Sequence, residues 1–124
     1  MGFFQDRDKL PLKQVNLTVT GTNWTTSRAV GVVYKTLNGA YRISFNIYGT
    51  VSVSTDSITL TVSGVTFLFT QAVAYSDGLA TSDIQLQQTG AGNGQIALES
   101  TGSGTERRVS GDVELASKPS FLEV

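Results

Sequence analysis

The stretch Ser57–Ser63, with the sequence SITLTVS, indicates the fold class of this chain. Every second side chain in it is apolar, and every intervening one is a small hydroxyl. Successive side chains of a β-strand point to opposite faces of the sheet. The alternation therefore predicts a strand with one face in a core and the other in water.

The same period recurs along most of the chain, and no segment has the period of an α-helix. The Asn38-Gly39 pair predicts a tight hairpin, because both residues tolerate the positive φ of a type I′ turn. About eight short strands between glycine-bearing turns predict an all-β fold, an antiparallel β-sandwich that is jelly-roll-like. The predicted strands cover residues 15–19, 28–36, 41–48, 57–63, 65–74, 83–88, 95–99 and 107–115.

The chain has 124 residues, which is enough for one domain with its own core. Residues 1–14 differ from the rest in carrying closely spaced charges, Pro11 and the adjacent Phe3 and Phe4, and we interpret them as an N-terminal arm before a sandwich domain of residues 15–124. Exposed phenylalanines are unfavourable in water, so Phe3 and Phe4 are expected to pack against this domain or a partner. A disordered start or a remnant of cloning is the alternative.

The composition favours some classes of partner over others. Only 15% of the residues are charged and the net charge is −1, with no basic patch of the kind that binds nucleic acid. The N-terminus has no apolar run suited to a signal peptide or a membrane span, so synthesis in a cytoplasm without membrane insertion is expected. A surface of Ser, Thr and Gly suits extracellular, virion or lectin-like proteins, although many β-sandwiches share it.

The chain contains no His and no Cys, which excludes the common catalytic triads, thiol chemistry and imidazole metal sites within it. A carboxylate pair of the glycosidase type remains conceivable, but the spacing of the acidic residues indicates no convergence. We therefore predict a protein that is not an enzyme, without cofactor or metal. The acidic candidates are Asp56, Asp77, Asp83, Glu99, Glu106, Asp112 and Glu114.

Several exposed or aromatic residues are candidates for binding. Trp24, near Arg28, is suited to stack on a sugar ring or to anchor an interface, or alternatively to close one end of a sandwich. The pair Arg107-Arg108 either binds an acidic partner or alternates in a strand so that one side chain points to a subunit contact.

Three apolar residues are expected opposite the core-facing residues of their strands: Val33, Tyr48 and Leu68. A second buried surface, supplied by an oligomer contact, would explain them. Single exposed apolar side chains on a monomer are the alternative.

The sequence resembles a domain found in virion proteins of tailed phages, often at the ends of tail fibres. The resemblance lies in residues 19–34, 39–47, 58–67 and 110–121, the last of which read SGDVELASKPSF. It implies a β-jelly-roll-like domain that assembles as a homotrimer on the virion surface, and it assigns no catalytic residue. In that setting Val33, Tyr48 and Leu68 would contribute to the trimer, and Phe3 and Phe4 would dock it onto other virion proteins.

The function expected from these observations is that of a non-enzymatic phage structural protein located in the virion. It would be a tail-fibre or baseplate tip domain that contacts a host cell-surface glycan or protein, with Trp24 and Arg28 as candidate ligand contacts. The alternative is a capsid decoration protein, of the cement or head-fibre type. A carbohydrate-active enzyme with a carboxylate pair is the more remote alternative.

Overall fold

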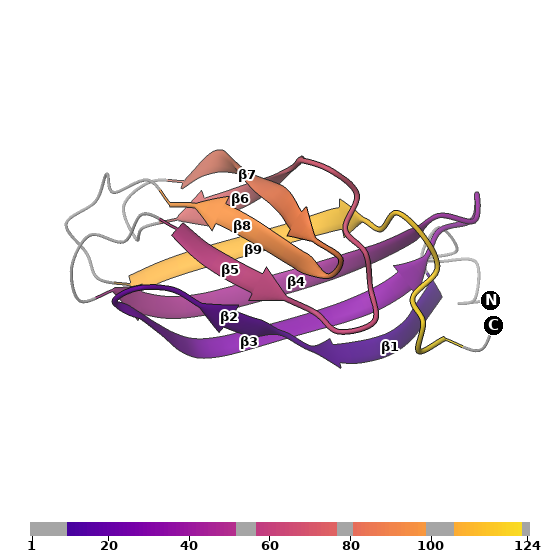
Figure 1. Cartoon of the computed structure of the whole chain (residues 1–124), viewed down its shortest axis with the longest axis horizontal. Helices are drawn as coiled ribbons and strands as arrows, with labels where there is room; N and C mark the ends of the chain where they lie inside the picture. Colours follow the sequence, from indigo (N-terminus) through magenta and orange to yellow (C-terminus); the bar gives the residue numbers. More distant parts are fainter. Residues whose placement is uncertain (1–9, 52–56, 77–80, 99–105, 123–124) are drawn as a thin grey trace, which may run out of the picture.

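The computed structural model describes residues 10–51, 57–76, 81–98 and 106–122, and these ranges contain β-strands and no helix (Figure 1). The prediction of an all-β, antiparallel fold is confirmed, since every strand pair is antiparallel. The strands are β1 (Leu10–Asn16), β2 (Thr18–Thr20), β3 (Trp24–Lys35), β4 (Tyr41–Val51), β5 (Ser57–Thr61), β6 (Gln71–Ser76), β7 (Thr81–Gly90), β8 (Asn93–Ala97) and β9 (Glu106–Glu114).

Hydrogen bonds join these strands into one nine-stranded sheet in the order β1-β3-β4-β9-β6-β7-β8-β5-β2. The sheet curls until its two edge strands, β1 and β2, approach each other, and β2 also contacts β3 (Figure 1). The edges are consecutive in the chain, with only Leu17 between them. The result is a nearly closed barrel, and the finer description as a two-sheet sandwich remains a prediction.

Two Greek keys follow from the strand order when β1 and β2 are counted as one strand interrupted at Leu17. In the first, β5 returns to lie beside β2, giving the spatial order β5-β1/β2-β3-β4. In the second, β9 returns beside β6, giving the order β9-β6-β7-β8. A fourth strand that returns beside the first of three consecutive strands defines this motif.

The segment Leu10–Thr20 closes the barrel by changing its partner at Leu17. Before that residue it pairs with β3, from Leu10 opposite Lys35 to Asn16 opposite Val30. After it, Thr18–Thr20 pairs with β5. Strand β1 thus begins inside the segment predicted to be an arm, because residues 10–14 find hydrogen-bond partners on β3 that sequence alone does not reveal. Phe3 and Phe4 lie outside the described residues.

The core lies inside this curled sheet and is built mainly from the alternating residues of the strands. On β5, Ile58 and Leu60 face inward as predicted, and on β4 the inward residues are Ile43, Phe45 and Ile47, all at most 1% exposed. Fully burying one such side chain contributes about 1.5–3 kcal/mol before entropy is counted. In these two strands, the period-2 pattern that predicted them also determines which side chains form the core.

The hairpin between β3 and β4 forms where the sequence predicts it, but with a different turn. Only Gly39 has a positive φ, at 90°, and Asn38 does not. The Gly39 amide donates to the carbonyl of Thr36 over 3.0 Å, and the Thr36 amide donates to the carbonyl of Ala40. A type I′ turn requires positive φ at both central residues, so the observed loop is the longer type with a single left-handed glycine.

The segment predicted as a strand over residues 65–74 is mostly irregular. Only its end belongs to β6, which begins at Gln71. Before it, Phe67 forms an isolated bridge with Leu115, and the Leu68 amide donates to the carbonyl of Glu114. The chain crosses from β5 to β6 here, which are not neighbours in the sheet, so it cannot maintain a continuous ladder.

Candidate functional site

Trp24 is buried at one end of the barrel instead of presenting its ring to solvent. It is 9% exposed, and its Nε1 donates to Oγ1 of Thr26 over 2.7 Å. Its ring lies against Gly49, where a Cβ atom would come within 2.2 Å of Cζ2. This geometry favours the interpretation that Trp24 closes the end of the fold.

Val33 faces the core, which corrects the expectation that it opposes the core-facing residues of its strand. Val33 is 0% exposed, whereas Val32 is 37% exposed. The reason is a β-bulge between Thr26 and Arg28, where Ser27 is an extra residue. One inserted residue exchanges the two faces of everything that follows, so Trp24 and Val33 both point inward although their numbers differ in parity.

Leu68 and its neighbour Phe69 lie in the irregular crossing before β6. Leu68 is half-buried, and Phe69 is 76% exposed, the largest exposure among the large apolar side chains that the structure describes. The sequence pattern placed Phe69 on the core side with Phe67. Because the chain bends away from the sheet after Phe67, alternation no longer determines which side chain is inside.

A row of two arginines and a tyrosine crosses three strands on the outer face of the sheet. Arg28 of β3 lies opposite Tyr48 of β4, and Tyr48 lies opposite Arg108 of β9. The guanidinium carbon of Arg108 stands 4.6 Å from the centre of the Tyr48 ring. Arg28 and Arg108 are exposed, and Tyr48 is half-buried. Arg28, a predicted ligand contact, and Tyr48, a predicted trimer contact, are therefore neighbours.

The adjacent arginines Arg107 and Arg108 alternate as one of the two predictions stated. Arg107 points inward, is 5% exposed, and donates from Nη1 to the carbonyl of Glu106 over 3.0 Å. Arg108 points outward to Tyr48. Only the second of the pair is thus available at the surface.

A hydrogen-bonded network joins β3, β4 and β9 further along the same outer face. The Tyr34 hydroxyl donates to the carboxylate of Asp112 over 2.5 Å, and Arg42 Nε donates to Oδ1 of Asp112 over 2.9 Å. Arg42 also donates from Nη2 to the carbonyl of Asp112, and its Nη1 lies 3.5 Å from Oε1 of Glu114. These four residues come from distant parts of the sequence, which is why sequence reasoning missed their network.

The network shifts the pKa values of two of its members. Burial, and then the hydrogen bond to Asp112, raise the pKa of Tyr34 above its ordinary value, so its hydroxyl keeps its proton. Burial lowers the pKa of Arg42, but hydrogen bonds to Asp112 and Tyr34 outweigh it and raise that pKa. The network holds one fixed arrangement of a donor tyrosine, a cation and two carboxylates, and it stabilises the pairing of three strands.

The acidic residues proposed for a carboxylate pair are only partly described. Asp112 and Glu114 are engaged by Arg42, Asp83 lies on β7 opposite Ala74, and Glu106 begins β9. Asp56, Asp77 and Glu99 lie outside the described residues. In the described ranges no three His, Cys, Asp or Glu residues are grouped as a metal site would need.

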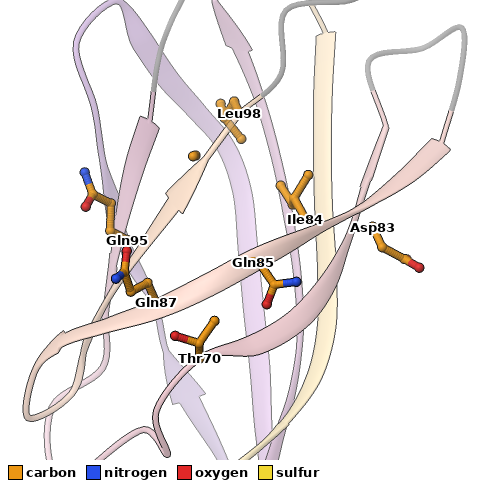
Figure 2. A pocket seen from close by; sticks show the side chains of 8 residues that line it. Thr70, Asp83, Ile84, Gln85, Gln87, Gln95 and Leu98 are labelled. Carbon is orange, nitrogen blue, oxygen red and sulfur yellow. The ribbon is translucent and has the colours of Figure 1, made fainter.

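A hollow of about 480 Å³ lies over β7 and β8, and Figure 2 shows the side chains that line it. Three of its side chains carry amide groups, Gln85 and Gln87 on β7 and Gln95 on β8. Gln87 is opposite Gln95, and Gln95 is opposite Thr59 of β5, so the polar face continues over a third strand. The lining also includes Thr70, Asp83, Ile84, Ala97 and Leu98.

The amides of this hollow retain unused hydrogen-bonding capacity. Gln95 Nε2 donates to Oγ of Ser57 over 3.2 Å, whereas Gln85 and Gln87, both exposed, make no side-chain hydrogen bond with any residue that the structure describes. Each amide offers two donors and an acceptor with two lone pairs. The hollow can therefore bind a ligand that presents both hydroxyl donors and acceptors, which is a chemistry that the strand pattern did not single out.

Comparison with protein-family models, curated proteins and solved structures finds no match for this chain. In the part of the chain described here, no helix is both long and apolar enough to cross a membrane.

Proposed function

We propose that the protein is a non-enzymatic structural domain of a tailed-phage virion, at the tip of a tail fibre or baseplate, where it contacts a host surface glycan. The observation that carries the proposal is the amide-lined hollow of Gln85, Gln87 and Gln95. Sugar hydroxyls both donate and accept hydrogen bonds, and amide side chains match them without adding charge. The resemblance of residues 19–34 and 110–121 to fibre-tip domains supports the setting.

The hollow is open and is expected to bind a single sugar weakly. In a trimer three copies would face one cell surface, and linked weak sites gain avidity without any new contact. The homotrimer is part of the proposal, and exposed apolar side chains support it, namely Val32, Leu37 and Phe69 at 37%, 68% and 76% exposure. A jelly-roll-like sandwich is the finer fold that we propose, supported by the two Greek keys, a motif common in β-sandwiches.

The first test measures binding of the full chain to a panel of purified neutral bacterial envelope polysaccharides. We expect binding to at least one of them and no shortening of its chains. The double substitution Gln85→Ala and Gln87→Ala should weaken binding by about tenfold, because each truncation removes donors and an acceptor. Gln14→Ala is the matched control, since Gln14 is an exposed glutamine on β1. Equal loss in both variants, or no binding, would overturn the proposal, and shortened chains would favour the enzyme alternative.

The second test concerns the virion setting and the oligomer. Gold-labelled antibody against the protein should mark the tail end of particles that carry it, whereas label over the capsid would favour the decoration alternative. Sedimentation should give a trimer, and Leu68→Asp should weaken it without unfolding the subunit. A monomer at micromolar concentration would contradict the trimer.

A further inference from the structure

The outer-face row of Arg28, Tyr48 and Arg108 combines features of an anion-binding site. Two arginines lie on either side of one tyrosine on three adjacent strands, whose register fixes their order, and the guanidinium of Arg108 stacks on the tyrosine ring. Neighbouring strands are about 4.8 Å apart, so the backbones carrying the two arginines are separated by about 10 Å. The site is built on paired strands and not on a loop, with Arg28 directly after the bulge at Ser27.

Neither arginine of the row has an acidic partner among the described residues. Arg42 differs from these two arginines, because Asp112 and Glu114 engage it. The chain as a whole has a net charge of −1. Glu106 lies two residues before Arg108 on the same face of β9, yet no ion pair joins them. Two cations on either side of one tyrosine repel each other slightly, and an anion placed between them would remove that repulsion.

Stacking on Tyr48 prepares Arg108 for binding. A guanidinium held over an aromatic ring keeps its planar N–H edge free to meet a carboxylate or phosphate with two parallel hydrogen bonds. Since the ring already restricts Arg108, less side-chain freedom is lost when the ligand binds. Arg28, on the other side of Tyr48, supplies the second charge.

The surroundings of the row indicate which kind of anion fits. The nearest outer-face positions on the same strands include three neutral hydrogen-bonding groups, Asn46 and Thr50 on β4 and Ser110 on β9, beside the apolar Val30 and the acidic Glu106. Nucleic acid needs a run of cations along its phosphates, and two arginines beside Glu106 do not provide one. We propose that this row binds an acidic glycan, whose isolated carboxylate or phosphate group meets the arginines while its hydroxyls meet the neutral neighbours. The inference uses a surface separate from the amide-lined hollow.

Binding of the full chain to two acidic polymers tests this site: polygalacturonate, which carries carboxylates, and teichoic acid, which carries phosphates. Dextran serves as the neutral probe, and duplex DNA and polyglutamate represent the other anionic classes. We expect binding to at least one of the acidic glycans, weakening as salt is raised because the site is exposed. The polymer that binds more tightly identifies the anionic group.

Variants locate the binding on the row. Arg108→Gln and Arg28→Gln should each reduce affinity for the preferred polymer by about tenfold, the usual effect of losing one charge-assisted hydrogen bond. Tyr48→Leu keeps both charges but removes the stacking, and it should cause a smaller loss. The matched control is Lys118→Gln, because Lys118 is an exposed cation near the end of the chain and its substitution changes the net charge equally.

Several results would overturn the inference. These are an equal loss in the Lys118→Gln control, an unchanged affinity in both arginine variants, no binding of either acidic glycan, or tighter binding of DNA or polyglutamate. Each variant should melt at the same temperature as the wild type, which would show that the losses of binding do not come from unfolding. The Gln85→Ala and Gln87→Ala variant should retain binding of the acidic glycan, so failure of the anion site and failure of the proposed function are distinguishable.

Discussion

Gly49 lies directly against the indole ring of Trp24, so closely that a Cβ atom on residue 49 would stand 2.2 Å from Cζ2 and 2.5 Å from Cη2 of the ring. The relationship joins the first residue of β3 to the last residues of β4, where Trp24 pairs with Val51. It explains why a glycine interrupts an otherwise β-favouring strand. The indole occupies the space that any other side chain at this position would fill.

Substitution of this glycine should destabilise the fold by overpacking. Gly49→Ala is expected to lower the free energy of unfolding by about 1–3 kcal/mol, measured by chemical denaturation. Gly90→Ala is the control, because its added Cβ would meet only the Asn93 side chain, with Nδ2 at 3.3 Å and Cβ at 3.9 Å. Combining Gly49→Ala with Trp24→Leu should recover part of the packing strain. A fully stable Gly49→Ala protein would mean that the indole can move away from this position.

The neighbouring residues Val32 and Val33 should respond in opposite ways to the same substitution. Val33→Asp places a carboxylate in the core and is expected to cost at least about 3 kcal/mol of stability. Val32→Asp should change stability by less than about 0.5 kcal/mol, since Val32 is 37% exposed. Melting temperatures of the two variants check the effect of the bulge, and a reversed order would show that Ser27 does not shift the faces.

The hydroxyl of Tyr34 should make stability depend on pH in the alkaline range. Its pKa is raised in the folded protein, so above about pH 10 the unfolded chain loses this proton while the folded protein retains it. The contribution of Tyr34 is therefore complete below pH 10 and declines as pH rises through the folded pKa. Tyr34→Phe should cost about 1 kcal/mol at neutral pH, and the difference from wild type should shrink above pH 10. A difference that is constant with pH would contradict the raised pKa.

Two truncations should separate the N-terminal residues by role. Deleting residues 1–9 leaves β1 whole, so melting and oligomeric state should be nearly unchanged, while incorporation into particles should be lost if Phe3 and Phe4 dock the domain. Deleting residues 1–14 also removes most of the pairing between β1 and β3, and the melting temperature should fall by several degrees. Differential scanning calorimetry of both truncations, with particle incorporation assayed in parallel, measures the two effects. Normal incorporation without residues 1–9 would exclude the docking role.

The local pattern of the sequence was sufficient where strands run without interruption. The alternation in β4 and β5 predicted both the strands and their buried faces, because a two-residue period determines which side chains share a face. The turns at Asn23, Gly39 and Gly92 were also predictable, since they occur at residues that tolerate positive φ, and all three have it. The candidate site is predicted less well: Arg28, Tyr48 and Arg108 belong to three separate predictions, and nothing in the sequence points to the glutamines of the hollow.

What the sequence determined by itself was thus the all-β class, most of the strands and the composition of the core, each of which depends on neighbours in the chain. The tertiary structure decided the rest. The extra residue at Ser27 exchanged the faces of β3, and the change of partner at Leu17 nearly closed the sheet. Tyr48 and Arg108 are 60 positions apart in the chain and meet through the pairing of β4 with β9. Tyr34 and Asp112 are 78 positions apart and meet across strand β4. A period of two residues carries no information about which distant strand lies alongside, because strand partners are chosen by the packing of the whole sheet.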